Sequence, residues 1–335
     1  VELRARFDEQ NNIDWSKQLQ DAGCTVLYGF DDYKVHSKLT LITSRVDGKY
    51  HYLTQIGTGN YNEKTSELYT DLSFITTRQS IGEEANAVFN NMALQRLTSE
   101  ADTMLVAPLR FKTVLLEEMD RQIALAMQGK PASIILKNNS INDPQIIAKI
   151  SEASCAGVRV DMIVRGICCV RAGVPGRTEN VHIRSIVGRY LEHSRIYCFG
   201  SGDNMRIYIA SGDFLTRNTE RRVEVGVRVD DPAIAKKLRG ILDLQLRDTV
   251  NAREMQPDGS YTKVKPAPGQ PPVDSQMAMF GYFKDGFVME QDKPKPAAAK
   301  VVAKKAGTKP GGRQTSSLRP ARTGLWQNLF GRSKK

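Results

Sequence analysis

The strongest constraint on this sequence is that one stretch of it occurs twice. Residues 24–42, CTVLYGFDDYKVHSKLTLI, align without a gap on residues 181–199, VHIRSIVGRYLEHSRIYCF, at a shift of 157 positions. The alignment places His36 on His193 and Lys38 on Arg195. A repeat of this kind predicts two copies of one structural unit.

Each copy has the pattern of a strand, a polar turn region with glycine, and a second strand that carries the histidine. Side chains two positions apart on a strand point to the same face, so each imidazole is expected beside its cation. A turn of small residues follows in both copies, GTGNYN at 57–62 and ASGDFLTRN at 210–218. The two turns predict matched loops beside the two histidines.

The region before the second copy predicts the fold class. Residues 132–137 indicate a buried strand, residues 143–157 a helix with an Asp-Pro start and a glycine stop, and residues 158–166 another strand. Strand, helix and strand in this order predict an α/β protein with a mostly parallel or mixed sheet in each copy. The opening VELRARF answers to VDMIVRG at 160–166, so the first copy is expected to lack its opening strand and helix.

Length and helical periodicity predict two domains and a tail. The 335 residues suffice for two cores, and residues 80–95, 111–129 and 231–256 have helical periodicity and are expected to serve packing. We predict a first domain over 1–104, a second over 105–275, and a linker with a tail over 276–335. No stretch has the roughly 18 apolar residues of a membrane span. Five cysteines without paired or metal-type spacing predict free thiols and a cytoplasmic location.

The net charge of +11 belongs to the tail. Residues 293–335 contain 12 Lys and Arg and no Asp or Glu, and subtracting them from +11 leaves −1 for residues 1–292. The tail is also rich in Pro, Ala and Gly, which predicts disorder. A solvated tail and a tether for a polyanion are both open interpretations. The folded part itself does not indicate a specific nucleic-acid partner.

A histidine beside a cation, present twice, indicates phosphoryl chemistry. A neutral imidazole can attack phosphorus, and Lys38 or Arg195 can offset the charge on the phosphoryl oxygens. The second histidine can donate a proton to the leaving oxygen or hold the phosphate. Asn60 in the first turn and Arg217 in the second are further candidates, whereas Arg222 with Glu224 looks like an ordinary ion-paired strand edge.

The paired histidine units resemble the phospholipase D superfamily, whose motif is H-x-K-x4-D followed by G-x-x-N. The acidic position is Thr43 in the first copy and Gly200 in the second. One group of proteins within this superfamily also lacks these aspartates, and the sequence resembles that group more closely. Six strings are similar to the two C-terminal domains of class 1 polyphosphate kinases: VELRARFDEQNNI, KVHSKLTLI, IGTGNYNEKTSELYTDLSF, IVRGICC, YLEHSRIYCF and YIASGDFLTRNTERRVEV. The similarity covers residues 1–256 and implies two tandem phospholipase D-like domains, the first one truncated.

This resemblance implies an enzyme that transfers the terminal phosphate of ATP reversibly to polyphosphate with Mg²⁺. It implies that His36 is the phosphorylated histidine and that His193 and Arg165 contact the nucleotide phosphates or assist the transfer. It further implies that Tyr69 contacts the nucleotide and that Arg6 binds phosphate beside the metal ion, because an arginine has no lone pair for a metal. A homo-oligomer is expected. Members of the family are about twice this length, so a fragment or shortened paralogue is expected.

Two other functions stay open. A phospholipase D-like phosphodiesterase would use the same histidines, but it would turn over phosphodiesters without ATP. A catalytically idle protein that binds polyphosphate would keep its binding after the substitution His36→Ala and would take no label from ATP.

Overall fold

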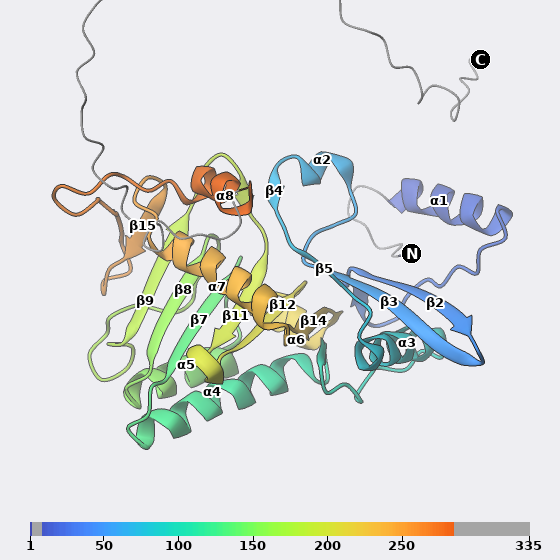
Figure 1. Ribbon diagram of the computed structural model, residues 1–335, viewed down its shortest axis with the longest axis horizontal. Coiled ribbons are helices and arrows are strands. Elements are labelled where there is room, and N and C mark those ends of the chain that lie inside the picture. The colour runs from blue at the N-terminus through green and yellow to red at the C-terminus, as the bar shows by residue number, and fades with distance from the viewer. Residues whose placement is uncertain (2–8, 285–335) are drawn as a thin grey trace, which may run out of the picture. The chain divides into compact units, whose positions relative to one another are not determined.

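The computed structural model describes Val1 and residues 9–284, so the predictions for Arg6 and for the tail beyond residue 284 lie outside the described residues. The α/β class is confirmed, with helices and strands interleaved along the chain (Figure 1). The described part of the chain contains eight α-helices: α1 (Glu9–Asp21), α2 (Glu63–Ser66), α3 (Gln79–Ala93), α4 (Phe111–Met127), α5 (Pro144–Cys155), α6 (Thr216–Glu220), α7 (Pro232–Leu246) and α8 (Ser275–Lys284). A short 3₁₀ turn covers Gly202–Asn204.

A nine-stranded mixed sheet forms the centre of the second repeat. Strands β7, β8 and β9 are parallel to one another, and the other neighbours in the sheet are antiparallel. Its strands, in spatial order, are β16 (Tyr261–Lys263), β15 (Ala252–Met255), β9 (Val181–Ile186), β8 (Arg159–Val164), β7 (Ser133–Asn138), β11 (Arg195–Phe199), β12 (Arg206–Ala210), β14 (Val225–Arg228) and β6 (Met104–Val106).

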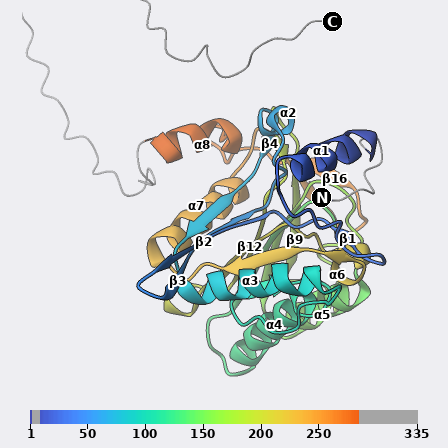
Figure 2. The same cartoon turned by 90° about the vertical axis from the view of Figure 1, so that its right-hand side faces the viewer.

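The described part of the first repeat has a smaller sheet, which is antiparallel. It consists of β2 (Leu39–Val46), β3 (Lys49–Gly57) and β5 (Ser73–Thr76), and α3 packs against it (Figure 2). These strands match β11, β12 and β14, which are themselves antiparallel. The parallel strands β7 and β8 have no counterpart in residues 9–104, so the described part of the first repeat lacks the mixed sheet predicted for it. The opening segment that answers to β8 lies almost entirely outside the described residues.

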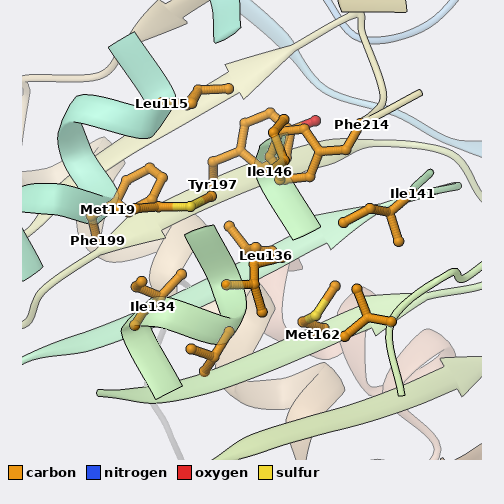
Figure 3. Packing of buried hydrophobic residues seen from close by; sticks show 14 of the residues in the cluster. Leu115, Met119, Ile134, Leu136, Ile141, Ile146, Met162, Tyr197, Phe199 and Phe214 are labelled. Atoms are coloured by element: carbon orange, nitrogen blue, oxygen red, sulfur yellow. The ribbon is translucent and has the colours of Figure 1, made fainter. Parts of the chain in front are cut away.

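Apolar side chains cover both faces of the large sheet. On one face α4 and α5 pack over β7 and β8, and the Tyr197 and Phe214 rings stack with centroids 4.5 Å apart (Figure 3). On the other face α3 and α7 contribute Ala85 and Leu242 to a second cluster. The Tyr197 hydroxyl donates to the Gly212 carbonyl at 2.7 Å. This core therefore fixes the second small-residue turn directly.

Local sequence signals before the second histidine are confirmed. The Asp143 carboxylate caps α5 by accepting from the Gln145 and Ile146 amides, and Pro144 takes the first helical position. Gly157 ends the helix region with φ of +86°, a conformation that favours glycine. Strands β7 and β8 flank this helix as predicted.

Two predicted elements are wrong. Residues 24–30 form no strand, although their counterpart β9 does; β9 pairs with β8 and β15, whereas no strand lies beside 24–30 in the described residues. The helix predicted over 231–256 ends at Leu246, and β15 follows. Buried Asp248 ends it, because its carboxylate accepts from the Asn251 and Ala252 amides and turns the chain.

Four two-residue strands join the repeats crosswise. Strand β1 (Lys34–Val35) of the first repeat pairs in parallel with β13 (Arg222–Val223) of the second. Strand β10 (Leu191–Glu192) of the second pairs in parallel with β4 (Tyr69–Thr70) of the first. The two pairings are equivalent under the internal repeat. Each histidine segment is therefore held by the short strand that lies after the small-residue turn of the other repeat.

Candidate active site

Each histidine lies in the gap between a short crosswise strand and a sheet strand. His36 follows β1, and His193 follows β10. The prediction that both histidines lie on strands is therefore wrong, because each histidine is the first residue after the end of its short strand. The reason is the crosswise pairing, because the chain must leave β13 or β4 before it joins its own sheet. The His36 amide still donates to the Val223 carbonyl at 2.9 Å, and the Ser194 amide donates to the Thr70 carbonyl at 2.8 Å.

The His36 ring is held by a carboxylate from the other repeat. Its Nδ1 lies 2.9 Å from Oε2 of Glu224, which is fully buried. The Ser211 hydroxyl donates to the same oxygen at 2.6 Å, and the Asn218 amide donates to Oε1 at 2.6 Å. Three partners therefore fix this carboxylate, and it in turn fixes the orientation of the ring. No described residue forms a hydrogen bond with Nε2 of His36.

The His193 ring is held in the corresponding way. Its Nδ1 lies 2.9 Å from both carboxylate oxygens of Asp71, which belongs to the first repeat. The Thr58 hydroxyl donates to Asp71 at 2.6 Å. The surroundings of Nε2 differ at His193, because Nη1 of Arg195 lies 3.2 Å from Nε2 and 3.4 Å from Nδ1 of that ring. The guanidinium therefore lies against the ring of His193, close to both of its nitrogens.

The two carboxylates are equivalent positions of the repeat. A shift of 153 positions carries Thr58, Gly59 and Asp71 onto Ser211, Gly212 and Glu224. A Cβ at Gly59 would lie 2.2 Å from Oδ2 of Asp71, and one at Gly212 would lie 3.0 Å from Cγ of Glu224. Both turns therefore bring the backbone into close contact with the carboxylate that orients a histidine.

Burial keeps both imidazoles neutral near pH 7. It lowers the pKa of His36 and of His193 below the ordinary value of 6.5, and the hydrogen bonds to the carboxylates offset this effect only in part. Burial alone would raise the pKa of Glu224, but the contacts with His36, Ser211 and Lys38 lower it to about 2. Since an ionised carboxylate accepts, Nδ1 of His36 carries the proton, and Nε2 presents a lone pair.

The two cations next to the histidines have different partners. Arg195 is buried and donates to both oxygens of Asp213, at 3.1 and 3.2 Å, and to the Thr58 carbonyl at 3.3 Å. Lys38 is also buried, and among the described residues its Nζ donates only to the His36 carbonyl, at 2.5 Å. Burial lowers the pKa of Lys38 to about 8. The two repeats therefore differ in how the cation lies near its histidine. Arg195 contacts the ring of His193, whereas Lys38 contacts the backbone carbonyl of His36.

Tyr69 and Arg165 lie beside His193. The Tyr69 and His193 ring centroids are 5.0 Å apart. Nε of Arg165 donates to the Asn139 side chain at 2.8 Å and to the Glu192 carbonyl at 2.6 Å. No described residue forms a hydrogen bond with its Nη1 or Nη2. A cavity of about 610 Å³ has Tyr69, Asp71 and Ser194 in its wall, whereas His193 and Arg165 do not line it.

The remaining predicted residues lie at the margin of the site. The Asn60 side chain is exposed and forms no hydrogen bond with a described residue, so it does not orient an imidazole. Arg217 is exposed on α6 and near Arg222.

Sequence reasoning missed the two carboxylates that orient the histidines. Glu224 is a site residue and not part of an ordinary ion-paired strand edge: its oxygen nearest Arg222 is 4.0 Å away, whereas His36 lies at 2.9 Å. Asp71 was overlooked inside the string ELYTD. The sequence does contain a signal for both carboxylates, because aligning the two turns at a shift of 153 places Asp71 on Glu224. The histidines align at a shift of 157, and this difference of four residues conceals the match between the carboxylates.

The described residues do not fit a resident magnesium site. They contain no group of three or more His, Cys, Asp or Glu arranged for a metal ion. The carboxylates in the site are already engaged: Asp71 and Glu224 by histidines, and Asp213 by Arg195. Among the described helices, none is both long enough and apolar enough to cross a membrane.

Family models match nearly the whole described chain. The model for polyphosphate kinase C-terminal domain 1 matches residues 1–98, and the model for C-terminal domain 2 matches residues 104–276. The chain is similar to the polyphosphate kinase of Staphylococcus haemolyticus, with 42% identity over 91% of this chain and 42% of the relative. It is 40% identical to that of Pseudomonas aeruginosa, over 83% of this chain and 40% of the relative.

A solved structure shows the same similarity. The crystal structure of polyphosphate kinase from Porphyromonas gingivalis aligns with a TM-score of 0.78 and 31% identity, over 85% of this chain and 43% of that chain. This chain thus spans about two fifths of the length of these relatives. It belongs to the polyphosphate kinase family, in the region described as C-terminal domains 1 and 2.

Proposed function

We propose that this chain carries the phosphotransfer site of an ATP:polyphosphate phosphotransferase, and that His36 is phosphorylated during turnover. The relatives are named polyphosphate kinases, which supplies the substrates of the proposal. One observation carries the choice of nucleophile: Nδ1 of His36 is fixed by Glu224, whereas Nε2 has no hydrogen-bond partner among the described residues.

The contrast with His193 supports His36 as the nucleophile. Both rings are neutral, and both use Nδ1 to contact a carboxylate. Only at His193 does an arginine lie against the ring, with Nη1 of Arg195 3.2 Å from Nε2 and 3.4 Å from Nδ1. A guanidinium in this place obstructs the approach of phosphorus and disfavours the positive charge that an attacking imidazole acquires. His193 in this state has no proton on Nε2, which favours a role in holding the phosphate over a role as proton donor.

The proposed reaction has two displacements at phosphorus. In the first, the Nε2 lone pair of His36 forms a bond to the γ-phosphorus of ATP, and the bond to the bridging oxygen breaks as ADP leaves. In the second, a terminal oxygen of polyphosphate attacks the same phosphorus, the P–N bond breaks, and the lone pair returns to Nε2. Glu224 stays ionised and stabilises the ring while it carries positive charge. Lys38, Arg195 and Arg165 offset the charge on the phosphoryl oxygens.

The substrates and assembly complete the proposal. The cavity beside Tyr69 has the size of a small-molecule site, and the proposed contact between Tyr69 and the nucleotide is compatible with this position. Magnesium would enter with the phosphates of ATP, because Mg²⁺ commonly binds through substrate phosphates. The proposed oligomer and the proposed role of Arg6 depend on features outside the described residues.

A labelling experiment tests the proposal. The chain is incubated with γ-labelled ATP and Mg²⁺, separated on an alkaline gel, and compared with the His36→Ala variant. We expect a band that is labile in acid, stable in base and absent from the variant. Because the relatives are longer, the same pair is also tested within the native protein from its source. Absence of label in both forms, with polyphosphate binding retained in His36→Ala, would favour the idle binding protein instead.

A further inference from the structure

A buried lysine of the second repeat lies close to His193, and the proposed reaction does not use it. Lys137 belongs to β7, the central strand of the large sheet, which lies between β8 and β11 (Figure 1). It stands opposite Ile196 of β11 and is 1% exposed. A buried ammonium is unfavourable unless its N–H donors have acceptors, so the contacts of Lys137 indicate what it does.

The Nζ atom of Lys137 contacts the residues on both sides of His193. It donates to the Ser194 carbonyl at 2.9 Å and to the Ser194 hydroxyl at 2.8 Å. Oε2 of Glu192, a residue that is 4% exposed, lies 3.2 Å from the same nitrogen. An ammonium has three N–H donors, and these three acceptors satisfy it. Lys137 therefore holds the chain directly before and directly after this histidine.

Glu192 is held by three further elements. Its carboxylate accepts from the Thr70 hydroxyl of β4 at 3.0 Å, from the Gln245 amide of α7 at 2.7 Å and from the Gln276 amide of α8 at 2.9 Å. Burial alone would raise the pKa of Glu192, but its contacts with Lys137, Gln276 and Thr70 lower it. The carboxylate is therefore ionised, and it anchors Lys137 at a fixed place beside His193.

This buried ion pair is better explained by geometry than by stability. The hydration that two charges lose on burial offsets their attraction, so such a pair adds little net stability, and its best-attested effect is to specify one arrangement. The arrangement specified here is that of His193, whose Nδ1 lies 2.9 Å from both carboxylate oxygens of Asp71. A displacement of the neighbouring Glu192 or Ser194 would carry the ring away from Asp71.

We propose that the Lys137–Glu192 pair positions His193, because by holding Glu192 and Ser194 it keeps Nδ1 of the ring on Asp71. Lys137 is thus a positioning residue that acts through His193 and needs no contact with a substrate. Its consequence for turnover rests on the proposed function, in which His193 holds the phosphate. The positioning itself can be observed without ATP, on the ring of His193.

The test is the tautomer of His193, measured by nitrogen NMR of labelled histidine without ATP, at about pH 8, where the imidazoles of the site are neutral. The chain has four histidines, and the variant His193→Asn assigns the signal. The wild type should show the Nδ1–H form that the contact with Asp71 requires. In Lys137→Met we expect the ratio of this form to the Nε2–H form to fall about 10-fold or more, because the hydrogen bond to an ionised carboxylate is lost.

The matched control is Lys112→Met. Lys112 belongs to the same repeat, its side chain is 12% exposed, and its Nζ lies 3.2 Å from an oxygen of the buried Asp143 carboxylate. Within the described chain neither Lys112 nor Asp143 forms a hydrogen bond or ion pair with His193. Both substitutions break an ion pair with a buried carboxylate and should destabilise the protein. Only Lys137→Met should change the tautomer ratio of His193, and the control should stay within about 2-fold of the wild type.

Two further variants keep the test decisive if Lys137→Met fails to fold. The double variant Lys137→Met with Glu192→Gln leaves no unpaired buried charge, so its urea midpoint should lie closer to that of the wild type. It still lacks the bonds from Nζ to Ser194 and should keep the altered ratio. Ser194→Ala removes only the hydroxyl acceptor and should shift the ratio in the same direction by a few-fold. A wild-type ratio in every folded variant, an equal change in the control, or an equal change at His36 would each overturn the proposal.

Labelling with ATP separates this proposal from the proposed function. If His193 holds the phosphate, the ATP concentration for half-maximal labelling of His36 should rise about 10-fold in Lys137→Met and stay within about 2-fold of the wild type in Lys112→Met. A changed His193 ring together with no labelling of any form, the wild type included, would uphold the positioning and contradict the proposed phosphotransfer.

Discussion

Nδ1 of His36 and Oε2 of Glu224 are 2.9 Å apart although the residues are 188 positions apart in the chain. The equivalent pair, His193 and Asp71, is 122 positions apart and has the same distance. Each histidine thus depends on a carboxylate from the other repeat. Neither repeat alone holds a complete imidazole–carboxylate pair, so the site exists only where the two repeats meet.

The substitution Glu224→Gln tests the orientation of the nucleophile. A glutamine amide can donate to Nδ1, which would shift the ring proton to Nε2 and remove the lone pair that attacks phosphorus. We expect the rate of His36 phosphorylation to fall about 100-fold or more. Nitrogen NMR of labelled histidine should show the changed tautomer. The control Ser211→Ala removes one of the three hydrogen bonds to Glu224, and we expect it to lower the rate of phosphorylation only a few-fold. A Glu224→Gln variant that is phosphorylated as fast as the wild type would contradict the role assigned to Glu224.

The rate of phosphorylation should depend on pH in two directions. The nucleophile is the neutral imidazole, so the rate rises with pH through the pKa of His36, which burial places below 6.5. Lys38 must be charged to bind phosphate, so the rate falls as pH rises through about 8. The charged groups facing Lys38 are Glu224, Asp71, Arg195 and Arg222.

Single-turnover rates between pH 5 and 10 check this profile. In Lys38→Arg the cation keeps its charge, and the alkaline limb should move above pH 10. An alkaline limb at about pH 8 that persists in this variant would show that Lys38 is not its origin.

Glycine substitutions in the two turns test the packing against the carboxylates. A Cβ at Gly59 would meet Oδ2 of Asp71 at 2.2 Å, and one at Gly212 would meet Cγ of Glu224 at 3.0 Å. We expect Gly59→Ala to destabilise the protein by about 1–3 kcal/mol and Gly212→Ala by less. In Gly57→Ala the nearest atom is the flexible Gln55 amide at 3.1 Å, so this variant serves as control. Urea denaturation measures the free energy of unfolding of the three variants and so ranks their stabilities. A Gly59→Ala protein as stable as the control would show that Asp71 is free to move.

Tyr69 provides a test of nucleotide binding. Tyr69→Phe keeps the ring that packs 5.0 Å from His193 and removes only the hydroxyl. If the hydroxyl bonds a nucleotide phosphate, the Kd for ATP should rise about 10-fold while the melting temperature stays near that of the wild type. Calorimetry with ATP and with tripolyphosphate separates nucleotide from phosphate recognition. Unchanged ATP affinity in Tyr69→Phe would limit the role of Tyr69 to packing.

The sequence predicted the elements whose signals are local. The Asp143 cap and Gly157 mark both ends of α5, and the apolar run before Lys137 marks β7, because capping and burial act within a few residues. It also predicted the two histidines and the cation beside each, since the repeat displays them.

The sequence did not predict the pairing between the repeats. The partner of His36 is set by the parallel register of β1 with β13, which has no signature in a two-residue strand. For the same reason Asp71 was overlooked and Glu224 looked like part of an ion-paired strand edge. The helix end at Leu246 was missed because Asp248 is bonded to Ser275, 27 positions away, as well as to its neighbours. Each of these errors concerns a contact between residues that are far apart in the sequence.

The most direct test is to determine which nitrogen carries the phosphate after labelling. The protein is phosphorylated by ATP, digested under alkaline conditions, and the phosphohistidine identified by mass spectrometry and phosphorus NMR. Because Glu224 holds Nδ1, we predict phosphate on Nε2 of His36 and none on His193. Phosphate on Nδ1 of His36, or on either nitrogen of His193, would contradict the account.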